Sequence, residues 1–146
     1  MWAPTAQVSD KEVAGRRVFT KKPYSGKNQY KTDVFLDDRL GTGLSVDRLG
    51  VRNADDEIVK ALSPKGHSLA ERMKKPFIGW AQFVVADLNK AKLKIHKTDA
   101  VGEENPFHAE VCRAHCQDQD DLYRTAFILA VISSNYDLLP PLQNDE

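Results

Sequence analysis

The sequence is poor in cysteine and lacks any long apolar run, and both features narrow the class of protein. The two cysteines among 146 residues, Cys112 and Cys116, do not make the disulfide framework of a small secreted protein. No apolar stretch approaches the ~20 residues that a membrane-spanning helix needs. The sequence therefore predicts a protein without membrane segments, whose two thiols stay reduced.

The sequence also lacks a linker and a leader. It has no Gly/Ser-rich or Pro-rich linker, and its first residues have neither the basic nor the apolar region of a signal peptide. We therefore expect a cytoplasmic protein with a single domain over residues 1–146, in which residues 1–12 and 140–146 are flexible. The composition, 41% hydrophobic and 29% charged, is ordinary for a soluble globular domain.

Negative charge is scarce in the first hundred residues. Residues 1–100 hold 19 Lys and Arg against 12 Asp and Glu, whereas residues 101–146 hold 2 against 9. Such a split can steer a polyanion to one side, or it can let the two parts attract each other. We favour mutual attraction, because a folded domain mixes distant parts of its chain.

The predicted fold is organised around residues 33–50. We predict a strand over residues 30–36, a turn at Gly41 and Gly43, and a second strand over residues 44–49. Period-two alternation puts two sets of side chains on opposite faces of this second strand: Leu44, Val46 and Arg48 on one, and Ser45, Asp47 and Leu49 on the other.

The rest of the chain supplies further strands and helices. Residues 77–85 form the most apolar stretch, so we expect Trp80 to lie in the core. Local patterns predict strands over residues 12–20, 80–84 and 92–97, and helices from Asn53 to about Ser63, over 68–75, 85–91 and 122–133. Together they predict a single-domain α+β fold: an antiparallel or mixed sheet of about four to five strands, with helices packed on one face.

Residues 107–116 fit two local structures. In a strand, His108, Glu110 and Cys112 share one face; in a helix opened by Pro106, His108 aligns with Cys112 and Cys116. We favour the strand.

A metal site at these residues is not expected. His108-Ala-Glu110 followed by cysteines is similar to the first half of a zinc-deaminase signature, but the Pro-Cys-x-x-Cys half is missing. A tetrahedral zinc site usually draws its ligands from two chain segments, not from one run of ten residues. We therefore predict free cysteines, no metal and no cofactor.

A candidate site arises if the strand at residues 44–49 lies near the strand at His108. The side chains of Ser45, Asp47, His108 and Glu110 would then share one sheet face. Arg39 or Arg48 could bind a phosphate or carboxylate there, with His108 and Glu110 as acid and base. The alternative is a hydrogen-bonded polar face without chemistry, and we favour it because the adjacency of the two strands is itself a hypothesis. An arginine among apolar side chains needs a partner, so we predict that Arg48 lies near Glu110, Asp47 or His108.

A second candidate surface is the basic segment 16–31. Its cations Arg16, Arg17, Lys21 and Lys22 are followed by Tyr24 and Tyr30. Basic and aromatic side chains can hold phosphates and stack bases, but we favour a solvated loop around the turn signals Pro23 and Gly26. We expect nucleic-acid binding that is at most weak and non-specific.

Two short motifs carry a family resemblance: Gly43-Leu-Ser-Val-Asp-Arg48 and Asn105-Pro-Phe-His-Ala-Glu-Val111. With Gly79-Trp80-Ala81 and the alternating residues 92–97, they make the chain resemble a diffuse set of small bacterial proteins of unknown function. The resemblance implies that His108 lies on a strand, but it implies no activity. The chain departs from this set by its Cys112–Cys116 run and by a longer helical insert at residues 53–75.

Three functions stay open on this basis. The first is a small bacterial cytoplasmic accessory protein, from a toxin–antitoxin or phage-defence cluster, that binds a protein partner or an anionic ligand. The second is a nucleotide- or RNA-directed enzyme that uses His108 and Glu110 as acid and base, with Arg39 or Arg48 on phosphate. The third is a nucleic-acid-binding protein that uses residues 16–31. The sequence makes no prediction of oligomeric state.

Overall fold

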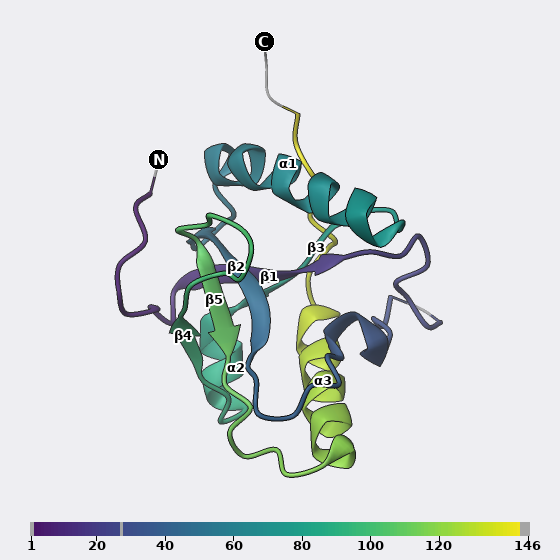
Figure 1. Cartoon of the computed structure of the whole chain (residues 1–146). Helices are drawn as coiled ribbons and strands as arrows, with labels where there is room; N and C mark the ends of the chain where they lie inside the picture. Colours follow the sequence, from purple (N-terminus) through teal and green to yellow (C-terminus); the bar gives the residue numbers. More distant parts are fainter. Residues whose placement is uncertain (1, 27, 144–146) are drawn as a thin grey trace.

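One antiparallel sheet forms the centre of the protein (Figure 1). Within residues 2–26 and 28–143, which the computed structural model describes, the strands are β1 (Glu12–Val18), β2 (Leu44–Val51), β3 (Gly79–Val84), β4 (Ile95–Lys97) and β5 (His108–Val111). The helices in the same residues are the short 3-10 helix η1 (Thr32–Phe35), α1 (Asp56–Met73), α2 (Val85–Lys90) and α3 (Gln119–Ser133).

The strands lie in the order β3-β1-β2-β5-β4, and each neighbouring pair is antiparallel. This confirms the predicted α+β class and the predicted number of strands. It also confirms that residues 108–111 form a strand rather than a helix. The strands β2 and β5 are neighbours, so the two motifs singled out in the sequence lie side by side.

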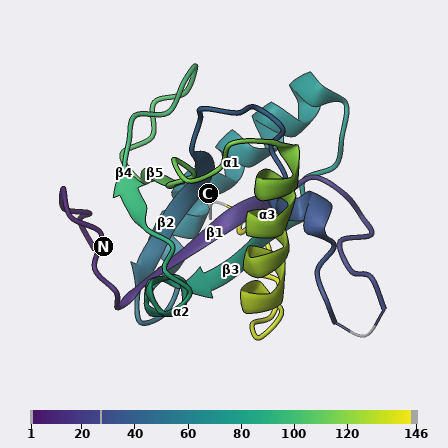
Figure 2. The same cartoon turned by 90° about the horizontal axis from the view of Figure 1, so that it is seen from below.

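The helices cover both faces of the sheet, so the expectation that they pack on one face is wrong. Figure 1 shows α1 above the strands and α2 and α3 below them, and Figure 2 shows α3 on the near side of the sheet and α1 behind it. The reason lies in the strands, which carry large apolar side chains on both faces. Trp80 of β3 packs in one core cluster, and its neighbour Ala81 packs in the other.

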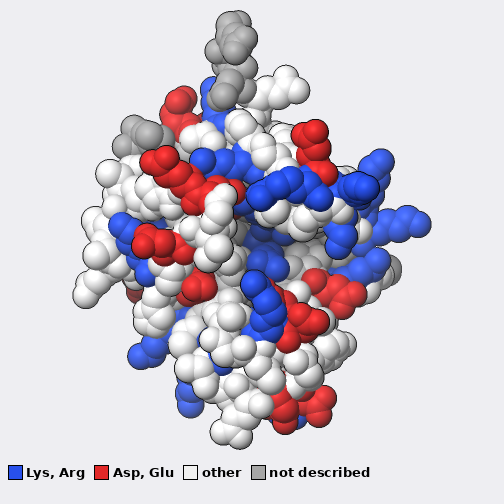
Figure 3. Space-filling model, in the orientation of Figure 1, with Lys and Arg blue, Asp and Glu red and all other residues white. Residues whose placement is uncertain are grey.

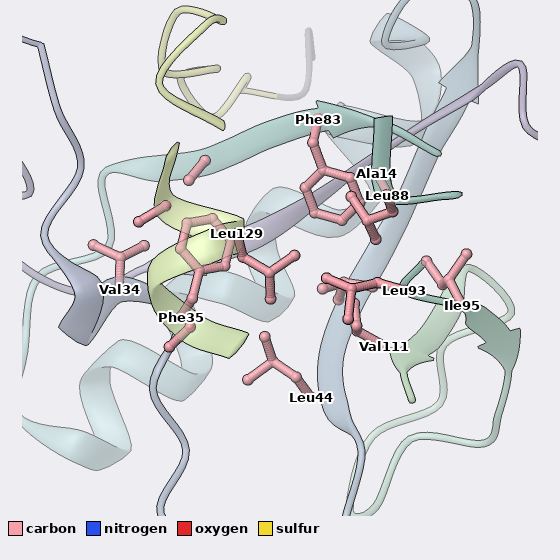
Figure 4. Close-up of a cluster of buried hydrophobic side chains, with 14 of the residues drawn as sticks. Ala14, Val34, Phe35, Leu44, Phe83, Leu88, Leu93, Ile95, Val111 and Leu129 are labelled. Carbon is pink, nitrogen blue, oxygen red and sulfur yellow. The ribbon is translucent and has the colours of Figure 1, made fainter. Parts of the chain in front are cut away.

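The larger core cluster lies between the sheet and the helices α2 and α3 (Figure 4). Alternate residues of β2, Leu44 and Val46, belong to it together with Phe35 from η1. Figure 4 shows Phe35 beside Leu129 of α3, with Phe83 close to Ala14 and Leu88, and Ile95 at the opposite end of the cluster. These contacts hold η1 and α3 together under the sheet.

The smaller core cluster fixes α1 on the other face. Trp80 is 0% exposed there, as predicted, and its ring meets the ring of Phe77 edge-on with centroids 5.1 Å apart. Phe77 also packs against α1 at Gly66, where an added Cβ would come within 2.4 Å of the ring. Gly66 therefore allows α1 to approach the sheet closely.

The predicted strand over residues 30–36 is wrong. Residues 32–35 form η1, whose turn is closed by hydrogen bonds from Val34 N to Lys31 O and from Leu36 N to Asp33 O. Val34 and Phe35 are buried all the same. The strand preference of residues such as Val and Phe largely reflects how well they pack on a half-buried pleated surface. A buried turn can bury the same side chains equally well.

The helical segment at residues 53–75 is one helix, not two. It begins after Asp55, whose side chain accepts a hydrogen bond from Glu57 N, and it ends at Lys74 in a left-handed conformation. Pro64 lies inside this helix. A proline removes one backbone hydrogen bond from a helix. Burial of side chains on both sides of Pro64, such as Leu62 and Ala70, stabilises the continuous helix in spite of that loss.

Both terminal segments contact the rest of the protein where they are described. Trp2 N donates to Asp55 Oδ2, and Leu139 forms an isolated bridge with Trp80. Leu142 N donates to Ser63 Oγ in α1. Flexibility was predicted for residues 1–12 and 140–146. Of these, residues 1 and 144–146 lie outside the described residues.

Candidate functional site

The pairing of β2 with β5 brings four predicted site residues onto one face. Ser45 lies opposite Glu110, and Asp47 lies opposite His108. Side chains directly opposite each other on antiparallel strands point to the same side of the sheet. The shared face that the sequence predicted is therefore present, and all four residues line one cleft.

This cleft, which we call the central cleft, has a volume of about 1030 Å³. Its walls come from β1, β2 and β5, from the loop over residues 36–43, from the end of α1 and from the loop over residues 99–103. Figure 3 shows basic side chains in and around a hollow below α1. Seven basic residues line the cleft: Arg16, Arg17, Lys22, Lys31, Arg39, Arg72 and Lys75.

The guanidinium of Arg17, in β1, binds two carboxylates. It donates to Asp47 at 2.8 and 3.2 Å and to Glu103 at 2.9 and 2.8 Å. Burial alone would lower the pKa of Arg17, but these two carboxylates outweigh burial and raise it. Asp47 also accepts from Trp80 Nε1 and from Asn105 Nδ2. This network is structural, because both carboxylates bind the single guanidinium and leave it no free positive charge for a ligand.

Arg16 is different, because it makes no ion pair with any residue that the structure describes. Its Nε donates to Val34 O at 3.3 Å and its Nη1 to Ser45 O at 2.9 Å, so both of its acceptors are neutral. Burial lowers the pKa of Arg16 to about 10; Asp37 opposes that shift and Arg113 adds to it. The guanidinium is therefore charged at neutral pH, with its charge uncompensated by direct contact.

Arg113 holds the cleft wall beside Arg16. Its guanidinium donates to the carbonyl oxygens of Asp37, Arg39 and Thr42, and to the hydroxyl of Thr42. It too has no carboxylate partner among the described residues, although it is buried. Arg113 thus fixes the loop over residues 37–42 and adds a second positive charge behind the cleft.

Arg39 lies on this loop and is paired at the surface. Its guanidinium binds both oxygens of Asp37, at 3.0 and 2.7 Å, and 68% of its side chain is exposed. The hydrogen bonds from Arg39 lower the pKa of Asp37 to about 2. An incoming anion would have to compete with Asp37 for Arg39, so Arg39 is a weaker candidate than Arg16 for the principal contact.

His108 is oriented by Thr98. Its Nδ1 lies 3.1 Å from Thr98 O and 2.9 Å from Thr98 Oγ1, and a carbonyl oxygen can only accept. If Nδ1 donates to that carbonyl in the neutral ring, Nε2 is the acceptor; in the other tautomer the Thr98 hydroxyl donates to Nδ1. Nε2 has no hydrogen-bond partner within the described part of the chain, and His108 lines the central cleft. Such an imidazole can accept a proton from a bound molecule.

Glu110 has neither an ion pair nor a hydrogen bond to a described residue, and it lines the same cleft. The backbone of the neighbouring loop approaches it closely, since a Cβ added at Gly43 would lie 2.8 Å from Glu110 Cβ. Residues two positions apart along one strand, such as His108 and Glu110, are separated by roughly 7 Å. His108 and Glu110 can therefore act on opposite ends of a small substrate group.

Arg48 does not take part in the cleft. It is 0% exposed and pairs with Glu12, so the prediction that it lies near Glu110, Asp47 or His108 is wrong. The sheet order explains the difference: Ala14 of β1 lies opposite Arg48, and Glu12 is therefore close enough to bind its guanidinium. Arg48 is fixed inside the protein, and its role is structural.

The basic segment 16–31 does not form the platform of cations and aromatic rings that the nucleic-acid hypothesis requires. Tyr30 is 1% exposed and stacks on Tyr24 with centroids 4.8 Å apart, so its ring is not free to stack on a base. Lys21 and Lys22 are exposed, whereas Arg17 is neutralised by carboxylates. Lys27 lies outside the described residues.

Cys112 and Cys116 are free thiols, as predicted. Cys116 Sγ lies 3.6 Å from His115 Nε2 and 3.5 Å from Thr125 Oγ1. Among the described residues, no group of three or more His, Cys, Asp and Glu side chains is placed to hold a metal ion. The helices in the described part of the chain are also too short or too polar to span a membrane.

A comparison of the chain with models of protein families, with curated proteins and with solved structures finds no match. The resemblance to small bacterial proteins therefore stays a prediction. The case for a function rests on the central cleft.

Sequence reasoning missed several residues of this cleft. Glu103 was given no role and Asn105 appeared only in the resemblance motif, yet both belong to the network around Arg17 and Asp47. Arg72 and Lys75 were assigned only to a helix and its end, and they line the wall on the α1 side. The adjacent arginines 16 and 17 could have indicated a charged site in the sheet. Adjacent strand residues point to opposite faces, so the two cannot both lie on a face open to solvent when only one face is open.

Proposed function

We propose that this protein binds an anionic ligand in the central cleft, with Arg16 as the principal contact. The observation that carries the proposal is the chemistry of Arg16: a half-buried guanidinium whose described partners are two carbonyl oxygens. A buried charge without a counter-charge is costly in a folded protein. An anion placed against Arg16 would relieve that cost, and a planar guanidinium can bind a phosphate or carboxylate through two hydrogen bonds.

Several neighbouring positive charges support the same reading. Six acidic residues line the cleft as well, and three of them, Asp37, Asp47 and Glu103, are already paired with Arg39 or Arg17. Arg113 adds positive potential behind Arg16 without being neutralised, and Lys22, Lys31, Arg72 and Lys75 line the cleft without an ion pair to a described residue. A cleft of about 1030 Å³ has room for a ligand of nucleotide size or larger. The protein is then a binding protein whose ligand carries a phosphate or carboxylate group.

Calorimetric titration tests this proposal. The probes are pyrophosphate, adenosine monophosphate and citrate, and the variants are Arg16→Met and, as the control, Arg124→Met on the exposed face of α3. We expect at least one probe to bind the wild type and the control equally, and to bind Arg16→Met at least tenfold more weakly, since a charge-assisted bidentate contact contributes about 1.5–3 kcal/mol. Unchanged binding by Arg16→Met would contradict the proposal.

A second function, an enzyme acting on a nucleotide or RNA, is favoured by one observation. His108 presents an unpartnered Nε2, and Glu110 presents an unpaired carboxylate, in the same cleft as Arg16. In this reading His108 Nε2 accepts the proton of an attacking hydroxyl or water, and Glu110, when protonated, can donate to the leaving oxygen.

Variants that keep the shape of these side chains separate the two functions. In an enzyme, His108→Gln and Glu110→Gln should each lower turnover of a nucleotide or short-RNA substrate by about a hundredfold or more, while pyrophosphate binding is kept. If a purified wild-type protein turns over a substrate no faster than His108→Gln does, the activity does not come from this site.

A further inference from the structure

The outer face of α3 is unusually apolar for a helix on the surface. Tyr123 is 53% exposed, Phe127 50%, Ile128 38% and Val131 43%. Tyr123, Phe127 and Val131 are four residues apart, and Ile128 lies next to Phe127, so the four side chains form one stripe along the helix. A surface helix normally turns polar residues to the solvent, and a contiguous apolar patch usually marks an interface.

A groove continues this stripe toward α2. It has a volume of about 410 Å³ and is lined by Phe127, Ile128 and Val131 of α3 and by Asp87, Lys90 and Ala91 near α2. Its charged residues are confined to the α2 side. The stripe and the groove together make a surface, which we call the α3 face, that lies on the opposite side of the sheet from α1.

The spacing of the stripe is symmetric about Phe127. An antiparallel copy of α3, placed on a two-fold axis at Phe127, would set Tyr123 of each copy against Val131 of the other. It would also stack the two Phe127 rings near the axis. A two-fold interface requires such a self-complementary surface. We propose that the α3 face binds the α3 face of a second copy of this chain, with the two helices antiparallel.

The charges at the two ends of α3 favour the same arrangement. The first turn is acidic, with Asp120 and Asp121, and no basic residue lies in the last turn. Lys90 borders the groove at the C-terminal half of the stripe, and 81% of its side chain is exposed. An antiparallel pair places Asp120 of one copy beside Lys90 of the other, whereas a parallel pair would bring the acidic turns together. Antiparallel helix dipoles also attract.

The size of the α3 face determines how stable we expect the dimer to be. Helix α3 has 15 residues, so it is about 22 Å long. A pair of such helices buries less than the ~800 Å² per partner of a standard stable interface. We therefore expect a dimer that dissociates on dilution rather than an obligate one. No residue of the α3 face lines the central cleft, so dimerisation leaves the cleft open, and the inference does not depend on the proposed function.

Sedimentation equilibrium of the full chain, from low to high micromolar concentration, tests the inference. We expect a monomer–dimer equilibrium in the wild type. Phe127→Glu should weaken association by at least about tenfold, because it places two carboxylates at the axis of an apolar contact. Val101→Glu is the control, since Val101 is fully exposed and lies away from α3; its association should equal that of the wild type. Circular dichroism checks that both variants keep their helices.

A charge exchange tests the antiparallel geometry. Lys90→Glu and Asp120→Lys should each weaken the dimer, and the double variant should recover at least part of the loss. A protein that stays monomeric at every concentration overturns the inference, whether or not it binds anionic vesicles or another protein through α3. A dimer that persists unchanged in Phe127→Glu overturns it equally.

Discussion

Arg48 and Glu12 form an ion pair inside the protein. Arg48 Nε lies 2.7 Å from Glu12 Oε1, and Nη2 lies 3.0 Å from Oε2. The guanidinium also donates to the carbonyl oxygens of Thr5 and Gln7, and the ring of Trp2 lies 5.3 Å from its central carbon. This pair therefore joins β1, β2 and the N-terminal segment at one buried point.

Breaking this pair should destabilise the protein strongly. Arg48→Met or Glu12→Gln alone should lower the free energy of unfolding by about 3–5 kcal/mol, because each leaves a buried charge without its partner. The double variant should lose much less than the sum of the two. Urea denaturation measures both effects, and Arg124→Met serves as a surface control. A single variant within about 1 kcal/mol of the wild type would show that the pair is not buried as described.

Gly66 should not tolerate alanine, although alanine is the better helix former. In an exposed helix the exchange would stabilise by about 1 kcal/mol. At Gly66 the added methyl group would meet the ring of Phe77 at 2.4 Å, and overpacking of this kind usually costs about 1–3 kcal/mol. We therefore expect a net loss of stability in thermal unfolding. The matched variant is Ala61→Gly on the exposed side of α1, which should lose about 1 kcal/mol; a stabilised Gly66→Ala would contradict the close packing of Phe77.

Acid should reduce the stability that the Asp37–Arg39 ion pair contributes to the folded protein. The pKa of Asp37 falls to about 2 in the folded protein, from an ordinary value of 3.8, through its hydrogen bonds with Arg39. The folded state then binds fewer protons than the unfolded state between these two values, so stability rises with pH across that window and is lost as pH falls through it. Asp37→Asn should flatten this part of the stability profile; an unchanged slope would contradict the pairing.

The strands around the site were predictable because their side chains alternate. The period of two in residues 44–49 fixed which side chains share a face, and the register with β5 then brought Ser45 and Asp47 to Glu110 and His108. Apolar density likewise identified Trp80 as a core residue. The alternation and the burial belong to short stretches of sequence, whereas the pairing of β2 with β5 was a hypothesis until the structure placed the two strands side by side.

The errors concern properties that depend on the sheet order or on distant contacts. Val34 and Phe35 favour a strand locally, but they are buried as a turn against α3. The partner of Arg48 is Glu12 because β1, not β5, carries the nearest carboxylate. Arg16 became the central residue of the site only because Val34 and Ser45 offer it carbonyl groups rather than carboxylates. No pattern in a single sequence encodes that difference.

The central claim is that the uncompensated charge of Arg16 receives an anion in the cleft. Tungstate is a tetrahedral oxyanion with a strong anomalous signal, so a crystal soaked in it reports the position of a bound anion directly. We expect an anomalous peak within hydrogen-bonding distance of the Arg16 guanidinium in the wild type, and its loss in crystals of Arg16→Met. A cleft without a peak, or a peak that persists in Arg16→Met, would show that Arg16 does not bind the anion.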